Sequence, residues 1–363
     1  MAAILVLGVK VPFTSGGQEV LVKSLVRELK NQGHSVDTVE MPFSLPDKYA
    51  LLSEAARWRS MSLAEFGGIK VDLVIATKFP SYYVAHPRKS LWLVHQHRPL
   101  YDLFGTNFSD ISTEPRMESL RNMMVDADTK ALKECQVITT ISQTVADRLK
   151  CYNNVVGTPL YPPLPLGHRY YSSSNSREHK PYILSIGRIC GIKRVDLMVK
   201  ALPKVHEFVS LKVVGEPDEH GIMEYLKNEV AKHHLGHRVE FLGRVSDESL
   251  LDLYAGATAV YYAPYQEDYG FVTLEAFASS TPVVTATDSG GTLEFVKDGE
   301  TGVIVSPTIE SIAEGCNRII SDDNLAKRLG AGGKSLIDKL SLVESWDNVV
   351  KTLLAPTLKD SLN

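Results

Sequence analysis

The sequence lacks three features that would assign it to a specialised class of protein. Its four cysteines, Cys135, Cys151, Cys190 and Cys316, include no Cys-x-x-Cys pair, which argues against a disulfide framework and against a zinc site. No segment approaches the roughly 20 apolar residues of a membrane-spanning helix. The short apolar stretch 1–8 has no basic segment before it, so we expect a buried strand there and not a signal peptide. These absences favour a cytoplasmic protein with reduced thiols.

An excess of charge of one sign is also missing. The chain has 39 Lys and Arg against 43 Asp and Glu, a net charge of −4, which is not basic enough to predict nucleic-acid binding. Residues 1–170 carry 19 Lys and Arg against 16 Asp and Glu, a weak positive bias that leaves peripheral association with an anionic membrane open. Hydrophobic residues make up 44% and charged residues 23%, so we expect a packed core and not disorder.

Apolar runs alternate with helical patterns along most of the chain. Ile4–Leu7 is a continuous apolar run, typical of a parallel strand that is covered on both faces. Residues 22–29 then place their apolar side chains on one helical face, and Gly33 is expected to end that helix. Further strands are expected at Val36–Val39, Leu73–Ala76, Leu91–Val94, Val137–Ile141, Tyr182–Ile186, Leu211–Val214, Val239–Leu242, Val260–Ala263, Pro282–Thr285 and Val303–Val305. Strands that alternate with helices predict an α/β protein with parallel sheets.

The length and one break in this pattern predict two domains. A chain of 363 residues is too long for one ordinary core. Several prolines followed by a polar stretch interrupt the alternation. We therefore expect a first Rossmann-like domain at 1–168, a linker at 169–180 and a second Rossmann-like domain at 181–345. Because open α/β sheets bind ligands at the carboxyl ends of their strands, two facing sheets would place the site in the cleft between them.

Two cations follow the first expected strand of the second domain. Arg188 and Lys193 lie five residues apart in a strand-to-helix loop, where they can converge on one anion. A diphosphate suits them, because arginine forks two oxygens and lysine adds a point charge. The alternative is that both are solvated surface cations.

A second motif follows the expected strand Val260–Ala263. Glu267 lies in a loop, Gly270 lets the backbone approach a ligand closely, and a helix is expected to begin near it with N–H groups that favour a phosphate. Glu275 would lie about a turn and a half into this helix. Carboxylates suit pairs of sugar hydroxyls. The alternative is that Glu267 only faces the helix dipole and that Glu275 is an ordinary helix carboxylate.

At this point the sequence resembles a known family. Glu267 and Glu275 form the E-x7-E signature of glycosyltransferase family 4, which has the GT-B fold and retains the configuration at the transferred sugar. Four further segments agree with that family in order, and the match is strong over about 181–305. They are Gly16–Glu19, Gly187–Lys193, Val239–Val245 and Gly290–Val296.

The resemblance implies a role for each matching residue. Arg188 and Lys193 would bind the donor diphosphate, Glu275 the ribose, and Glu267 the hydroxyls of the donated sugar. Backbone groups would complete the donor site, and no metal or other cofactor would be needed. Those groups are the N–H groups of Gly270, Phe271 and Val272, the base-contacting segment Gly243, Arg244 and Val245, and the loop of Gly16 and Gly17 closing over the diphosphate.

Two residues of the first half also match the family. His95, at the end of an apolar strand, resembles its cleft histidine, which contacts the donated sugar. His97 would point the other way if the strand continued, and both could also be ordinary loop histidines. Ser142 matches a family serine, although we favour a helix cap for it.

Two further patterns are weak. Asp126-Ala127-Asp128 has the form of a metal-binding DxD string, but in a helix at 117–134 the two carboxylates would diverge. A dinucleotide oxidoreductase would need G-x-G-x-x-G after its first strand, and the sequence does not supply it.

The sequence therefore predicts a retaining, metal-independent glycosyltransferase. Its donor would be a nucleoside diphosphate sugar and its acceptor a saccharide, a lipid-linked sugar or a small molecule. Trp346 resembles a family element that crosses back, so we expect a C-terminal helix at 346–363 to pack on the first domain. A helix-like segment, 47–66, could touch a lipid-linked acceptor or be an ordinary amphipathic helix. A GT-B-fold nucleotide-sugar epimerase and a non-catalytic nucleotide-sugar binding protein are the alternatives.

Overall fold

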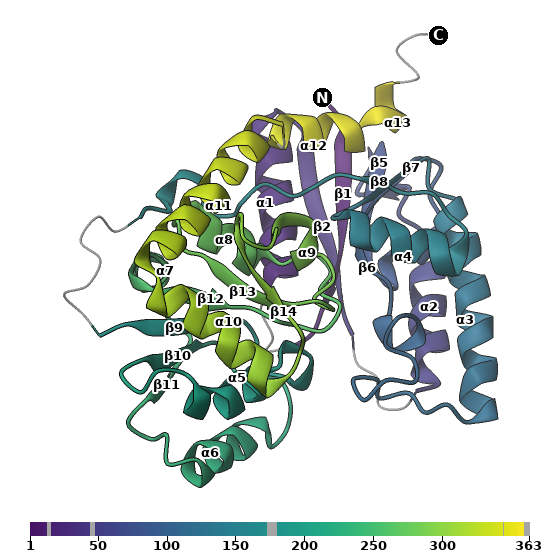
Figure 1. The fold of residues 1–363 in the computed structure, drawn as a ribbon. Coiled ribbons are helices and arrows are strands. Elements are labelled where there is room, and N and C mark those ends of the chain that lie inside the picture. The colour runs from purple at the N-terminus through teal and green to yellow at the C-terminus, as the bar shows by residue number, and fades with distance from the viewer. Residues whose placement is uncertain (13–15, 44–47, 173–179, 344, 359–363) are drawn as a thin grey trace. The chain divides into compact units, whose positions relative to one another are not determined.

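The chain folds into two compact units in the computed structural model, which describes residues 1–12, 16–43, 48–172, 180–343 and 345–358 (Figure 1). Unit 1 consists of Met1–Pro165 together with Val343–Asn363, and unit 2 consists of Leu166–Leu342. The boundaries expected from the sequence, at 168 and 345, lie three residues from these.

Unit 1 is built on one parallel six-stranded sheet with the order β2-β1-β5-β6-β7-β8. Its strands are β1 (Ala3–Lys10), β2 (Ser35–Pro42), β5 (Leu73–Lys78), β6 (Lys89–His95), β7 (Val137–Thr140) and β8 (Thr158–Pro159). The central strands β5 and β6 are almost entirely buried, as their continuous apolar runs predict.

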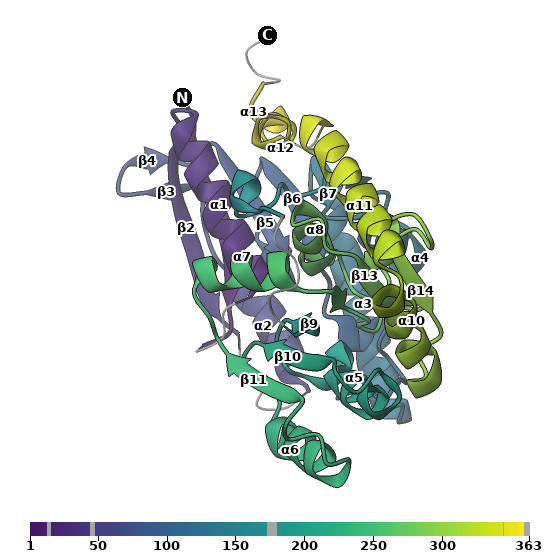
Figure 2. The ribbon, with the colours of Figure 1, turned by 60° about the vertical axis from the view of Figure 1, so that its left-hand side comes forward.

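The helices of unit 1 come from both ends of the chain. They are α1 (Gly17–Asn31), α2 (Ala50–Arg59), α3 (Pro115–Lys133), α4 (Gln143–Asn153), α12 (Trp346–Leu353) and α13 (Ala355–Leu358), with the 3-10 turns η1 (Ser81–Tyr83) and η2 (Arg98–Leu100). α1 packs against β1 and β2 (Figure 2). None of the helices in the described ranges is both long and apolar enough to cross a bilayer.

Unit 2 is built on a second parallel sheet with the order β11-β10-β9-β12-β13-β14. Its strands are β9 (Tyr182–Ile186), β10 (Ser210–Val214), β11 (Val239–Gly243), β12 (Ala259–Tyr261), β13 (Val283–Ala286) and β14 (Gly302–Val305). Its helices are α5 (Val195–Ala201), α6 (Ile222–Lys232), α7 (Asp247–Gly256), α8 (Phe271–Ala278), α9 (Thr292–Phe295), α10 (Ile309–Ser321) and α11 (Asp323–Val343), with the 3-10 turns η3 (Gly167–Arg169), η4 (Gly191–Lys193) and η5 (Leu202–Lys204).

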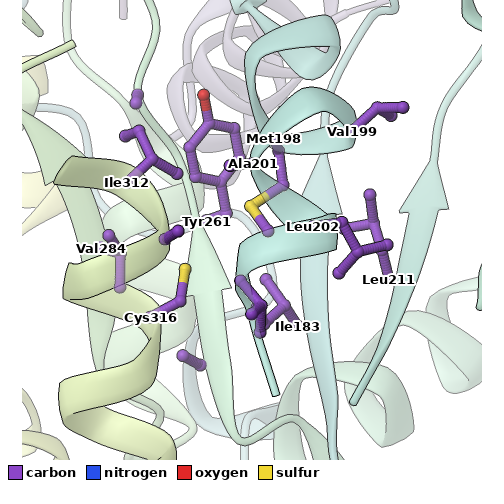
Figure 3. Close-up of a cluster of buried hydrophobic side chains, with 14 of the residues drawn as sticks. Ile183, Met198, Val199, Ala201, Leu202, Leu211, Tyr261, Val284, Ile312 and Cys316 are labelled. Carbon is purple, nitrogen blue, oxygen red and sulfur yellow. The ribbon is translucent and has the colours of Figure 1, made fainter. Parts of the chain in front are cut away.

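The strand order of unit 2 is that of a Rossmann fold, because the chain builds outward from β9 to β11 on one side and from β12 to β14 on the other. The order reverses between β9 and β12, and ligands of open α/β sheets bind beyond the carboxyl ends of the strands at such a point. One face of this sheet packs on α5 and α10. Figure 3 shows Met198, Ile312 and Cys316 of these two helices gathered around the buried ring of Tyr261 in β12.

The C-terminal segment packs on unit 1, as expected from the sequence. The ring of Trp346 meets that of Trp92 edge-on, with 6.1 Å between centroids. The Ser90 hydroxyl donates to the carbonyl of Leu353 at 2.7 Å. The GT-B prediction of two Rossmann-like domains with a C-terminal helix returning to the first is thus confirmed for the helices at 346–358, and 359–363 lie outside the described residues.

Two local expectations need correction. The helix expected over 47–66 covers only Ala50–Arg59, and its expected end lies in a hairpin of β3 (Glu65–Phe66) and β4 (Ile69–Lys70). The sequence carries the signal for this hairpin, since Gly67-Gly68 is a two-residue turn. In addition, Arg169, placed at the start of the expected linker, is anchored to unit 2 by ion pairs with Asp247 and Glu248.

Candidate active site

Two loops at the order reversal of unit 2 carry the charged residues that the sequence singles out. The first follows β9 and runs from Gly187 to the end of η4 at Lys193. The second follows β12 and runs from Tyr262 to Gly270, the residue before α8. Because β9 and β12 are neighbouring parallel strands, the two loops leave the sheet side by side at the same edge.

An ion pair joins the two loops. Lys193 Nζ donates a hydrogen bond to Glu267 Oε2 and another to the Tyr262 hydroxyl at 3.1 Å. Only 15% of the Lys193 side chain and 18% of the Glu267 side chain are exposed. Burial, followed by the charge of Glu267, raises the pKa of the Tyr262 hydroxyl well above its ordinary value. The two motifs, 74 residues apart in the chain, therefore meet in one place around a neutral tyrosine.

The second predicted cation, Arg188, lies in the same loop as Lys193 but pairs with another carboxylate. Arg188 donates to Asp218, and 49% of its side chain is exposed. Burial lowers the pKa of the Arg188 guanidinium, but the charges of Asp218 and of Glu267 outweigh it, and the net shift is upward. Arg188 and Lys193 thus both interact with Glu267, which brings the two cations to one region of unit 2.

A third cation, missed by the sequence analysis, fixes the first loop. The Arg194 guanidinium donates to both carboxylate oxygens of Asp288, at 2.8 and 2.7 Å. The Tyr261 hydroxyl donates to the Arg194 carbonyl at 3.0 Å. Because Asp288 follows β13, this fork ties two loops together and holds Lys193, the preceding residue. The only signal for Arg194 in the sequence is its position next to Lys193.

Backbone contacts hold the second loop and explain the glycine pair at 290–291. Gly291 N–H donates to the Glu267 carbonyl at 2.7 Å, and Gln266 N–H donates to the Asp288 carbonyl at 2.9 Å. Gly290 has φ +56°, and a Cβ there would lie 2.6 Å from the Glu267 carbonyl oxygen. A side chain at position 290 would therefore displace the backbone that carries Glu267.

The helix start predicted at Gly270 is also found beside Glu267. Gly270 caps α8, which begins at Phe271 and continues through Val272, so its N-terminal dipole is directed toward the end of this loop. The hydroxyls of Thr273 and Thr292 are buried and have no hydrogen-bond partner within the described residues. Their Oγ1 atoms lie 3.6 and 3.0 Å from where a Cβ of Gly270 would be. The sequence analysis did not single out these two hydroxyls, one in α8 and one at the start of α9.

Glu275 lies in the second turn of α8, and its carboxylate already accepts a hydrogen bond within the protein. Tyr254, fully buried in α7, donates its hydroxyl to Glu275 Oε2 at 2.6 Å. Burial raises the pKa of the Glu275 carboxyl, and the hydrogen bond from Tyr254 opposes that rise. The ring of Tyr170 meets that of Tyr254 edge-on at 6.1 Å, which places a residue of the expected linker beside Glu275.

The segment expected to contact the nucleotide base begins at Gly243, the last residue of β11. The Gly243 carbonyl accepts from Gly215 N–H at 2.9 Å. The Arg244 N–H donates to Glu216 Oε1 at 3.2 Å, so one of the backbone groups assigned to the base has a carboxylate partner in this structure. Val245 directly follows.

In unit 1, the glycine pair lies at the start of α1. Gly16 precedes the helix, Gly17 is its first residue, and Gly16 N–H donates to the Glu19 carboxylate at 2.8 Å. The rest of this loop, 13–15, lies outside the described residues.

His95 is the last residue of β6 and is half-buried, and its Nδ1 lies 2.6 Å from the Gln96 carbonyl. His97 is partly buried and packs against the rings of Phe43 and Phe79, and burial lowers its pKa to about 4. The role of His95 stays a prediction.

The remaining candidates behave as structural residues. Ser142 accepts from Val145 N–H at 3.1 Å and caps α4, so the cap interpretation is confirmed. Asp126 is exposed whereas Asp128 is buried, so the DxD carboxylates diverge as expected. Within the described ranges, no group of three or more His, Cys, Asp or Glu side chains gathers as a metal site.

The predicted site residues thus fall into two sets, one in each unit. Unit 2 holds Arg188, Lys193, Gly243, Arg244, Val245, Glu267, Gly270, Phe271, Val272 and Glu275, and unit 1 holds Gly16, Gly17 and His95.

Comparison with known proteins points to glycosyltransferases. Residues 169–336 match the family model described as glycosyl transferases group 1. An uncharacterized glycosyltransferase of Methanocaldococcus jannaschii is 26% identical over 94% of this chain and 93% of its own length.

Solved structures resemble the whole chain in fold. Sucrose-phosphate synthase from Thermosynechococcus elongatus superposes with a TM-score of 0.77 at 19% identity, covering 99% of this chain and 98% of its own. HepE of Anabaena, solved with UDP and glucose, superposes with a TM-score of 0.72 at 16% identity, covering 98% of this chain and all of its own.

Proposed function

This chain is a glycosyltransferase with the GT-B fold, and from that premise we propose that it moves a hexose-type sugar from a nucleoside diphosphate sugar to an acceptor hydroxyl with retention of configuration. The observation that carries the proposal is the ion pair of Lys193 with Glu267, which joins the loop that also contains Arg188 to the loop that ends at the start of α8. A diphosphate is the leaving group that such a set suits, because it gains negative charge as the sugar departs.

The two cations would stabilise the leaving diphosphate in different ways. Arg188 has a planar fork that fits two phosphate oxygens, and about half of its side chain is accessible. Lys193 is more buried, so its charge acts in a medium of lower dielectric. At an effective dielectric of about 20, a charge pair 4 Å apart interacts by roughly 4 kcal/mol. Because these two side chains supply the positive charge, the proposal needs no metal ion.

Carboxylates would orient the rest of the donor. Glu275 would accept from the ribose hydroxyls beside its contacts with Tyr254 and Tyr170. Glu267 would accept from hydroxyls of the transferred sugar, together with the N–H groups at Gly270–Val272 and with His95. The backbone of Gly243–Val245 would contact the base.

The chemistry then needs no protein nucleophile. The acceptor oxygen attacks the anomeric carbon on the face from which the phosphate leaves, and the bond between that carbon and the phosphate oxygen breaks. The acceptor proton passes to a leaving phosphate oxygen. The products are a glycoside with the original anomeric configuration and a nucleoside diphosphate.

The acceptor is a saccharide, a lipid-linked sugar or a small molecule in this proposal. HepE, one of the structural neighbours, was solved with UDP and glucose, so UDP-glucose is a rational first donor to test.

The test is a panel of nucleoside diphosphate sugars and acceptors, read by NMR for the glycoside, its anomeric configuration and the nucleoside diphosphate. We expect Lys193→Ala to lower kcat/KM on the order of a hundredfold or more. Lys200→Ala is a matched control, because Lys200 likewise bonds a carboxylate, Asp196, and a tyrosine hydroxyl, Tyr225, but lies in α5. It should leave kcat/KM unchanged.

Three outcomes would contradict the proposal. An inverted product would refute retention, and equal activity of the two lysine variants would refute the site. A new nucleotide-sugar epimer formed from donor alone would instead favour the epimerase alternative.

A further inference from the structure

A buried network of polar side chains begins at the residue after His95. Gln96 is fully buried, and its Nε2 donates to Asn153 Oδ1 at 3.0 Å. Asn153, the last residue of α4, donates in turn to Thr129 Oγ1 at 2.8 Å and, through a longer contact of 3.5 Å, to the Tyr101 hydroxyl. The end of β6 is therefore bound to α4 and, through Thr129, to α3.

The network ends at a buried carboxylate. Asp128, also in α3, accepts from the hydroxyls of Tyr83 and Tyr101, one on each carboxylate oxygen. All three side chains are buried. Tyr101 lies six residues after His95, so the chain from His95 to Tyr101 is fixed at both ends to α3 and α4.

The geometry of His95 determines which of its nitrogens carries the proton. Nδ1 lies 2.6 Å from the backbone carbonyl of Gln96. A carbonyl oxygen can only accept, so Nδ1 must be the donor. In the neutral ring, Nε2 is then an acceptor. The Gln96 carbonyl thus sets the tautomer of the ring and contributes to its orientation.

The presence of an amide at the buried position 96 is not explained by the stability of the folded state. Its Oε1 is buried and has no hydrogen-bond partner among the described residues. An unsatisfied buried acceptor destabilises the folded state, whereas an apolar side chain of the same shape avoids that cost. What the amide does provide is a directed hydrogen bond to Asn153 from the same residue, Gln96, whose backbone carbonyl contacts the His95 ring.

We propose that Gln96 and Asn153 are positioning residues that hold the Gln96 carbonyl, so that His95 stays in its Nδ1–H tautomer and presents Nε2 as an acceptor to a hydroxyl of the transferred sugar. This inference rests on the proposed function, because it assigns the acceptor role of His95 within glycosyl transfer.

The test replaces the amide by an apolar chain of similar length. In Gln96→Met the hydrogen bond to Asn153 is lost but the backbone carbonyl remains. We expect 15N NMR of the imidazole nitrogens, at a pH where the ring is neutral, to show one Nδ1–H tautomer of His95 in the native protein and a mixture in the variant. The signal is assigned by its absence in His95→Ala. Since ångström-scale misplacement is costly, kcat should fall on the order of tenfold, with little change in the KM for the donor.

Asn153→Ala should reproduce both effects, because it removes the other partner of the same hydrogen bond. The control is Tyr83→Phe. It also removes one hydrogen bond of the network, the one that the Tyr83 hydroxyl donates to Asp128, but it leaves the Gln96–Asn153 bond in place. It should lower the Tm while keeping the tautomer and kcat of the native protein.

The outcomes separate this inference from the proposed function. A single Nδ1–H tautomer in Gln96→Met, or a loss of kcat in Tyr83→Phe as large as that in Gln96→Met, overturns the positioning role. A native protein that transfers no sugar contradicts the proposed function, and the tautomer spectra then still decide whether Gln96 orients His95.

Discussion

The two units hold their candidate site residues by different forces. In unit 2, the loops after β9, β12 and β13 are joined by ion pairs, Lys193 with Glu267 and Arg194 with Asp288, whose side chains all remain partly exposed. In unit 1, the residue after His95 is held to α4 and α3 by hydrogen bonds among the uncharged side chains of Gln96, Asn153 and Thr129. The loop that follows is joined to α4 by an ion pair as well, between Asp102 and Arg148.

This difference separates residues that bind from residues that position. A partly exposed lysine paired with a carboxylate can exchange or share that partner with an incoming anion, because both states keep its charge compensated. A buried amide has no such alternative, since leaving it unpaired costs its full desolvation. The ion-paired loops of unit 2 are therefore suited to bind a charged donor, and the network of unit 1 is suited to fix the direction of one imidazole.

The comparison is sharpened by separating the backbone contacts of the unit 2 loops from their ion pairs, and Gly290 tests the backbone contact with the largest expected effect. Gly290→Ala should lower the free energy of unfolding by about 4 kcal/mol, because it adds left-handed strain and a backbone clash with Glu267. Gly299→Ala is the control, since Gly299 also has a positive φ but nothing lies within 4 Å of its Cβ. It should cost about 1 kcal/mol. Equal losses in urea denaturation would contradict the close backbone contact.

The buried network of unit 1 predicts a pH dependence. Burial raises the pKa of Asp128 from 3.8 to about 6, although the hydroxyls of Tyr101, Tyr83 and Tyr82 oppose this rise. The folded state therefore binds the proton of Asp128 more tightly than the unfolded state does. The stabilisation that protonated Asp128 contributes is full below about pH 4 and is lost as the pH rises through about 6.

Asp128→Asn removes this titration. The stability of the native protein relative to the variant should fall by up to about 3 kcal/mol between pH 4 and 7, measured by urea denaturation at each pH. A difference that stays constant over this range would show that Asp128 does not titrate as its burial requires.

The smallest expected effect is a loss of stability in Arg194→Lys, and its dependence on salt concentration tests the difference between the two units. Arg194→Lys keeps the charge but loses the two-pronged contact with Asp288, so we expect a loss of about 1 kcal/mol in stability. Because 14% of Arg194 and 27% of Asp288 are exposed, 1 M salt should reduce this loss. The pH-dependent term of Asp128 should change little with salt. The same salt response in both units would remove the distinction drawn between them.

The sequence predicted the parts of the fold that depend on local pattern. Segments rich in apolar residues located every strand of unit 2 to within about two residues, because buried parallel strands are mostly apolar. The convergence of Arg188, Lys193 and Gly270 followed from the rule that parallel strands end at one edge, together with the family resemblance. The short β8 and the β3–β4 hairpin were missed, since two-residue strands carry no periodicity.

Pairings between distant residues could not be predicted. Arg194 and Asp288 are 94 residues apart in the chain, and Tyr254 lies 21 residues from Glu275. Gln96 and Asn153 form no motif, because a buried hydrogen bond needs only two polar side chains in register. These residues hold the candidate site residues in place but belong to no sequence motif, so only the structure reveals them.

The most direct test of the central claim compares the binding of a nucleoside diphosphate with that of the nucleoside alone by calorimetry. The ratio of the two dissociation constants isolates the contribution of the phosphates. In Arg188→Ala and in Lys193→Ala this ratio should fall on the order of tenfold or more, which corresponds to about 1.4 kcal/mol, while Lys200→Ala keeps the native ratio. If the native ratio persists in both site variants, Arg188 and Lys193 do not hold the leaving group and the account is wrong.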